Sequence, residues 1–151
     1  MFLKKEYYLL VRLKTILNGN ENISDEDVNK ALDVAQATEF VSKLKGGVDY
    51  DISQGGTNVS GGQKQRLSIA RAIAKNPDIY VFDDSFSALD FKTDAKLRGE
   101  LAKITKDKTV LIVAQRISTI MNADKIVVLD EGRVVGIGTH KELMKNCNVY
   151  K

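Results

Sequence analysis

Several features that would place a protein in a particular class are scarce or missing in this 151-residue chain. Cys147 is the only cysteine, so no internal disulfide is possible and a reducing compartment is expected. Residues 9–17 are largely apolar, but Arg12 and Lys14 interrupt them. The stretch is also far shorter than the ~20 apolar residues that a bilayer span needs. The composition predicts a globular domain without a membrane span of its own.

Concentrated charge is also missing. The 23 basic and 20 acidic residues are spread along the chain and leave a formal net charge of +3. A nucleic-acid-binding surface would need a basic stripe, so we expect no nucleic-acid partner. The single histidine, His140, stands at the start of the last predicted helix, where a solvated neighbour of the helix cap is a better interpretation than a catalytic base.

One further absence concerns phosphate chemistry. None of the eleven glycines belongs to a G-x-x-x-x-G-K-[ST] loop, the nest of backbone N–H groups and a lysine that cradles nucleotide phosphates. Two other elements of such chemistry are present, namely Ser60-Gly61-Gly62-Gln63 and, about twenty residues later, an apolar run that ends in Asp83-Asp84.

Helix and strand signals alternate from residue 60 onward, which predicts an α/β fold. Ser24, Ser60, Asp90 and Thr139 are placed to cap helices. The helices are expected over residues 10–17, 25–36, 39–44, 61–75, 91–105, 117–121 and 140–144, and in the fourth of them Arg66 is expected to turn away from the buried face. Residues 46–56 indicate a loop with a short extended piece. Strands are expected at 79–82, 109–114, 125–129 and 133–137, the first two buried and parallel and the last two joined by a hairpin turn.

The segment Ser60-Gly61-Gly62 would present free N–H groups, a hydroxyl and the positive end of a helix dipole to one point in space. Such a point suits a phosphate group. An ordinary capped helix with a flexible entry is the alternative for these three residues alone.

The two carboxylates after the first strand would lie at the C-terminal edge of a parallel sheet, where open α/β folds bind ligands. Asp83 could hold Mg²⁺, and Asp84 could orient a water molecule for attack on phosphorus. Taken alone, the pair could instead cap the next turn.

Together with Ser87-Ala88-Leu89-Asp90 and the tail from Ala123 to Arg133, these motifs closely resemble the ATP-binding subunit of ABC transporters. The sequence of residues 138–143 resembles that of the exporter branch of the family, of the multidrug or lipid type. The resemblance implies a partial P-loop NTPase (RecA-like) core, without the half that carries the phosphate loop. It divides the chain into a poorly matching segment 1–20, a helical subdomain 21–75 that carries the signature motif, and a partial core 76–151.

The resemblance also implies roles for individual residues. Ser60, Gly61, Gly62 and Gln63 match the signature that reaches the γ-phosphate held by the other subunit of a head-to-tail dimer. Asp83 matches the metal-binding Walker B aspartate, and Ser87–Asp90 matches the loop at the dimer seam, with Asp90 close to the nucleotide. Gln54-Gly55-Gly56 matches, weakly, a loop that contacts the transmembrane domains.

Two residues depart from the family pattern at the same site. Asp84 stands where most members have the catalytic glutamate, and its carboxylate would stop roughly 1.5 Å short of the water, a misplacement that can cost on the order of 10²-fold in rate. Gln115 stands where the family has its switch histidine and offers no titratable ring. The pairing resembles one subunit of a heterodimeric exporter, in which one of the two ATP sites is slow.

The expected function is therefore that of the C-terminal part of an exporter ATPase, which binds ATP and Mg²⁺ in the assembled transporter at the inner face of the cell membrane. The expected partners are a second ATPase subunit and the transmembrane domains, and the chain alone is expected to be inactive. The alternatives are a stand-alone module that pairs with a complete ATPase subunit and an inactive truncation remnant. In the family, a phosphate-loop strand separates the strands equivalent to 109–114 and 125–130, so we expect either a gap between these two or a direct pairing.

Overall fold

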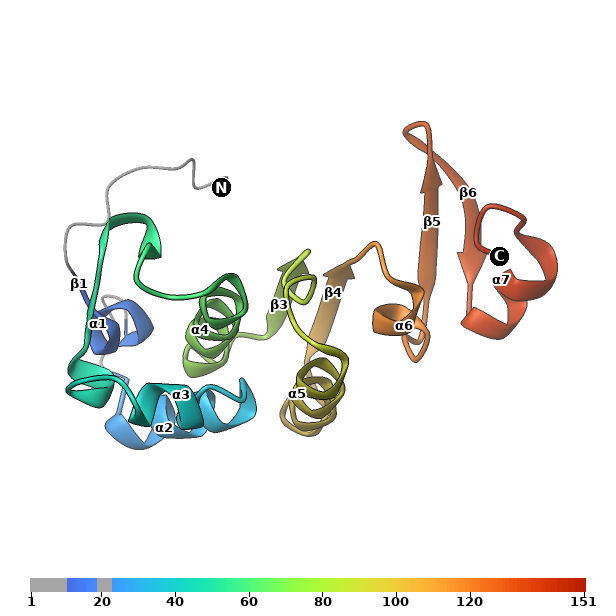
Figure 1. The fold of residues 1–151 in the computed structure, drawn as a ribbon. Helices are drawn as coiled ribbons and strands as arrows, with labels where there is room; N and C mark the ends of the chain where they lie inside the picture. Colours follow the sequence, from blue (N-terminus) through green and yellow to red (C-terminus); the bar gives the residue numbers. More distant parts are fainter. Residues whose placement is uncertain (1–10, 19–22) are drawn as a thin grey trace.

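The computed structural model describes residues 11–18 and 23–151. Figure 1 shows three groups of elements that follow one another along the chain: a helical group, a two-stranded parallel sheet with its crossover helix, and a hairpin with two short helices. None of the helices in these described ranges has the length and apolarity to cross a membrane.

The helical group begins with a two-residue strand that leads into a short helix. Its elements are β1 (Val11–Arg12), α1 (Leu13–Asn18), α2 (Asp25–Val34), α3 (Thr38–Ser42), β2 (Asp51–Ile52) and α4 (Gly61–Ala74), with 3₁₀ turns at Gly47–Asp49 and Gln54–Gly56. β1 pairs antiparallel with β2, and α2 packs against α4. The first helix was predicted over residues 10–17. Leu10 lies outside the described residues, and the prediction is wrong for Val11–Arg12, which form β1, so the helix begins at Leu13.

The four predicted helix caps are all confirmed. Ser24 accepts a hydrogen bond from the N–H of Asp27, Ser60 from Gln63, Asp90 from Thr93 and Thr139 from Glu142. Each cap satisfies an N–H group that would otherwise have no partner in the first helical turn. The helices end within about two residues of the predicted positions. Ala35, Lys75 and Thr105 are the C-caps of three of them.

The prediction for Arg66 was wrong. Its guanidinium is half-buried, donates to the carbonyl of Gln36 at 2.7 Å and lies 4.7 Å from the centre of the Phe40 ring. Arg66 therefore joins α4 to α3 and to the turn between α2 and α3, since a long side chain can pack its stem and still satisfy its charge locally.

The central sheet has two parallel strands, β3 (Ile79–Asp83) and β4 (Thr109–Val113), connected through α5 (Phe91–Ile104). The parallel pairing confirms the prediction, but the expectation that these strands are buried is wrong for one face. Tyr80 and Phe82 are buried in the main hydrophobic cluster, whereas Ile79 and Val81 are each 62% exposed. Apolar residues at successive positions suit a sheet covered on both faces, and here only one face is covered.

The third group consists of α6 (Ile117–Ile120), β5 (Ile126–Asp130), β6 (Arg133–Gly138) and α7 (His140–Asn146). β5 and β6 form the predicted antiparallel hairpin, and its turn residues Glu131 and Gly132 have φ values of 45° and 75°, as a tight hairpin turn requires. Strands β4 and β5 belong to separate sheets and leave a gap, as in the first of the two expected arrangements (Figure 1).

Helix α7 packs against the hairpin through a small cluster of its own. Leu143, Cys147 and Tyr150 are buried there with Ile126. The interpretation of His140 as a solvated residue was wrong: it is half-buried and shares a 3.0 Å hydrogen bond with the Tyr150 hydroxyl, so the only histidine contributes to this packing. Gly136 allows the approach, because a Cβ at that position would lie 2.9 Å from the Cys147 sulfur.

We predict that Gly136→Ala destabilises the hairpin and α7 by about 1–3 kcal/mol, since the added methyl group overpacks a buried contact. Gly99→Ala is the matched control. Gly99 lies on α5, and a Cβ added there would meet no atom within 4 Å, so this change should stabilise the chain by about 0.5–1 kcal/mol through helix propensity. Urea denaturation measures both effects, and equal midpoints for the two variants would contradict the packing described.

Candidate functional site

The tip of helix α4 carries the four residues of the predicted signature. The Ser60 hydroxyl oxygen accepts from the N–H of Gln63 at 3.2 Å, and the Gln63 amide oxygen accepts from the N–H of Ser60 at 2.8 Å. This reciprocal capping box fixes the helix entry. The N–H groups of Gly61 and Gly62 have no acceptor among the described residues, and the Ser60 hydroxyl hydrogen is not used in the cap. The tip can therefore donate several hydrogen bonds to an anion.

The glycines also permit a close contact between the tip and the segment that follows β3. A Cβ at Gly62 would lie 3.0 Å from the carbonyl oxygen of Ala88, and one at Gly61 would lie 3.8 Å from the Ala88 side chain. The signature tip and the predicted dimer-seam segment, Ser87–Asp90, are therefore packed together within this chain.

Asp83 and Asp84 end strand β3 at the expected edge of the sheet. Both are exposed. Asp84 has φ 47°, a left-handed conformation that few non-glycine residues adopt, and its N–H donates to the carbonyl of Val113 on β4 at 3.0 Å. The backbone thus turns sharply at Asp84, directly after the last residue of β3.

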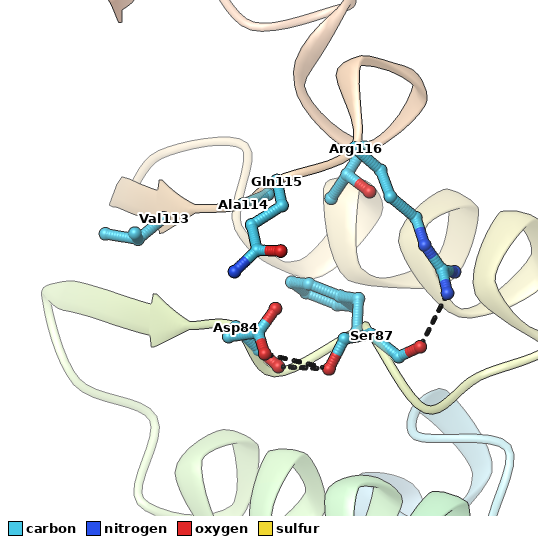
Figure 2. A pocket seen from close by; sticks show the side chains of 8 residues that line it. Asp84, Ser87, Val113, Ala114, Gln115 and Arg116 are labelled. Carbon is cyan, nitrogen blue, oxygen red and sulfur yellow. Dashed lines mark hydrogen bonds between the residues drawn. The ribbon is translucent and has the colours of Figure 1, made fainter. Parts of the chain in front are cut away.

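Asp84 and Gln115 line one small pocket of about 140 Å³ between the ends of β3 and β4. Figure 2 shows the Gln115 amide pointing from its loop into the pocket, toward Asp84. Oδ2 of Asp84 accepts from the Ser87 hydroxyl at 3.0 Å. The structure therefore brings together the two residues that depart from the family pattern.

Arg116 fixes the wall of this pocket. Its guanidinium donates to the carbonyl of Ser87 at 2.7 Å (Figure 2) and to that of Leu89 at 3.4 Å. The helix that follows, α6, is held by Arg98 of α5, which donates to the Ser118 carbonyl at 3.0 Å and pairs with the buried Asp94. Gln115 thus lies between the end of β4 and a segment, Arg116–Ser118, that is held by hydrogen bonds to α5 and to the segment after β3.

Asp90, a candidate nucleotide contact, uses both carboxylate oxygens to cap its own helix. Oδ1 accepts from the N–H of Thr93 at 2.9 Å, and Oδ2 accepts from the Thr93 hydroxyl at 2.7 Å. The backbone N–H of Thr93 is the main reason that the pKa of Asp90 lies below its ordinary value. The carboxylate is therefore held as an anion at the start of α5.

A metal ion at this site would need ligands other than the described side chains, such as water or phosphate oxygens. No group of three or more histidine, cysteine, aspartate or glutamate side chains in this part of the chain could hold a metal ion by itself. Mg²⁺ at phosphate sites typically needs only one or two carboxylates, with water and phosphate oxygens as the other ligands. Asp83, exposed and with no side-chain partner in the described ranges, fits that kind of site.

Sequence reasoning missed the side chains that hold the motifs together. Gln65 of α4 contacts the segment after β3 through three hydrogen bonds, and Lys64 donates to the Gly55 carbonyl at 2.8 Å, which ties the loop at Gln54–Gly56 to α4. Arg116 is the third. Each is an ordinary polar residue beside a recognised motif, so only that proximity could have pointed to it.

Comparison with known proteins places this geometry in a family. The family model for ABC transporters matches residues 5–87, more than half of the chain. The match begins within the segment 1–20 and includes Ser60–Gln63, Asp83 and Asp84.

Individual relatives agree. An uncharacterized ABC transporter ATP-binding protein of Mycobacterium tuberculosis is 47% identical over 85% of this chain, and a Staphylococcus aureus protein whose name assigns it to multidrug export, as an ATP-binding/permease protein, is 44% identical over 91%. A bacterial Atm1-family ABC exporter solved with ATP bound matches 95% of this chain with a TM-score of 0.88 and 34% identity.

The chain spans about a fifth to a quarter of the length of these relatives: 22% and 24% of the two proteins and 25% of the solved exporter. The α/β fold class and the family resemblance inferred from the sequence are both confirmed. The family match and these relatives, together with the capped tip of α4 and the carboxylates at the end of β3, establish that the chain belongs to the ABC transporter family and is similar to the ATP-binding domain of its exporter-type members.

Proposed function

We propose that this chain supplies Ser60–Gln63 in trans, that is, to the γ-phosphate of ATP held by a second ABC ATPase subunit. The observation that carries the proposal is the tip of α4, where the N–H groups of Gly61 and Gly62 have no acceptor among the described residues. The capping box aligns these groups before any ligand arrives, so little ordering is needed on binding.

We propose further that Asp83, Asp84 and Gln115 form this chain's own contribution to the other ATP site of the dimer. Asp83 would hold Mg²⁺ with the nucleotide phosphates, and the metal would supply charge neutralisation during phosphoryl transfer. Asp84 lies in the pocket with Gln115, but its carboxylate already accepts from Ser87 and is one methylene shorter than glutamate. This supports a slow site.

The assembly that we propose includes transmembrane domains, with these residues at the inner face of the membrane. The loop at Gln54–Gly56 supports this role because hydrogen bonds define its conformation in the chain alone. The Ser53 N–H and hydroxyl both donate to Asn58, and Lys64 holds the Gly55 carbonyl. The exposed apolar face of β3 and β4 supports association with further protein. No feature of the site favours a nucleic-acid partner.

A charge change at the signature tip tests the trans contact. Ser60→Asp and Ser60→Asn both keep a side chain that caps a helix, but only aspartate places a negative charge beside the phosphate. We expect the chain to co-purify with a complete ABC ATPase subunit and to stimulate its ATP turnover. Ser60→Asn should keep most of that stimulation, and Ser60→Asp should lower it by about 10-fold or more, since a hydrogen bond to a charged group is lost and repulsion is added.

Equal stimulation by the Ser60→Asp and Ser60→Asn variants would contradict the proposal, whereas co-purification without any effect on turnover would favour an inactive remnant.

Restoration of the family residues tests the slow site. In an assembled transporter whose other subunit has an intact signature, the double change Asp84→Glu with Gln115→His should raise turnover at this site by up to about 10²-fold. Each single change should give less, because both side chains face one pocket. Turnover is measured with the other ATP site disabled, and an unchanged rate would show that these two residues do not limit the site.

A further inference from the structure

Gln65 joins helix α4 to the segment that follows strand β3. Its amide nitrogen donates to the carbonyl of Asp84 at 3.1 Å and to the Ser87 hydroxyl oxygen at 3.0 Å. Its amide oxygen accepts from the N–H of Ala88 at 2.9 Å. One half-buried side chain thus binds three residues that lie 19 to 23 positions away along the chain.

The three partners require an amide. Two of them accept hydrogen bonds from the nitrogen end of Gln65, and the third donates to the oxygen end. A carboxylate of the same length could serve the N–H of Ala88 but could not donate to the carbonyl of Asp84, and an apolar side chain could do neither. Because the amide is half-buried, a lost bond would not be fully replaced by water.

Ser87 links Gln65 to Asp84 through hydrogen bonds to both residues. The Ser87 oxygen accepts a hydrogen bond from Gln65, so its own hydrogen is directed to Asp84, where it can reach the carbonyl at 3.1 Å or Oδ2 at 3.0 Å. Figure 2 shows these two bonds at the mouth of the pocket that Gln115 also lines. The direction of the Ser87 hydroxyl, and with it the orientation of the Asp84 carboxylate, depends on which end of the Gln65 amide faces it.

We propose that Gln65 is a positioning residue that couples the signature tip of α4 to the Asp84 carboxylate and to the segment Ser87–Ala88. The contact of Gly62 with the Ala88 carbonyl supports the same coupling at the other end of the segment. The functional consequence rests on the function proposed above. If the tip binds a phosphate on the other subunit, the position that it adopts is transmitted through Gln65 to this chain's own ATP site.

Two substitutions test the oxygen end and the nitrogen end of the Gln65 amide separately. Gln65→Leu removes the acceptor of the Ala88 N–H, so we expect that amide to exchange with solvent about 10-fold faster, as the loss of one hydrogen bond predicts. Gln65→Glu keeps this acceptor but draws the Ser87 hydrogen to itself. We therefore expect unchanged exchange at Ala88 and a shifted carboxyl ¹³C resonance of Asp84. Ser68→Ala is the control, because Ser68 is an exposed residue of the same helix, and it should change neither signal.

Normal exchange at Ala88 in the leucine variant, or an unmoved Asp84 resonance in the glutamate variant, would overturn the proposal. If the leucine variant does not fold, Ser87→Ala with native Gln65 tests the same path, since it must also shift the Asp84 resonance. These measurements use the chain without nucleotide or partner. Their failure would concern Gln65 alone, whereas failure of the paired Ser60 variants would concern the trans contact.

Discussion

The packing of the α4 tip against the segment that follows β3 is the constraint on which the rest of the site depends. The hydrogen bonds of Gln65 and the close approach of Gly62 to Ala88 join two motifs that are distant in sequence. Arg116 then holds the carbonyls of Ser87 and Leu89 from the opposite side. The segment is therefore fixed between α4 and the loop after β4, and the Asp84 carboxylate is fixed with it.

This arrangement explains how one helix tip can be both a structural element and a binding element. The Ser60 oxygen and the Gln63 side chain satisfy the local capping requirement. That leaves the N–H groups of Gly61 and Gly62 and the Ser60 hydroxyl hydrogen as donors at the start of α4, with no acceptor among the described residues for the two backbone groups. Since the helix dipole adds a partial positive charge at the same end, the tip favours a phosphate ligand without a lysine.

The sequence predicted the features that depend on local interactions. The caps at Ser60 and Thr139 and the hairpin turn at Glu131-Gly132 follow from side-chain chemistry within a few residues, and all were confirmed. Tertiary contacts were not predictable in this way. The partners of Gln65 and Arg66 belong to other elements, so neither role leaves a periodic pattern. The apolar run of β3 indicated burial on both faces, but a run cannot show whether a second layer covers the sheet.

The same distinction applies to the site: the sequence pattern indicated which residues belong to it but not their tertiary contacts. The family pattern identified Asp84 and Gln115, and the structure places both in one pocket, but the hydrogen bond from Ser87 that orients Asp84 could be found only in three dimensions. Asp90 was expected to cap α5 and to lie close to the nucleotide; the cap is confirmed, but the sequence did not indicate that it occupies both carboxylate oxygens. A position in a motif therefore indicates where a side chain lies better than it indicates which atoms that side chain contacts.

The central claim is that the tip of α4 serves a nucleotide bound by another subunit. Amide hydrogen exchange at Gly61 and Gly62 tests it most directly, with the chain measured alone, with ATP and Mg²⁺, and with a second ABC ATPase subunit loaded with ATP. The account predicts slower exchange at these two amides only when the loaded subunit is present. Equal slowing by ATP and Mg²⁺ in the absence of that subunit would contradict it.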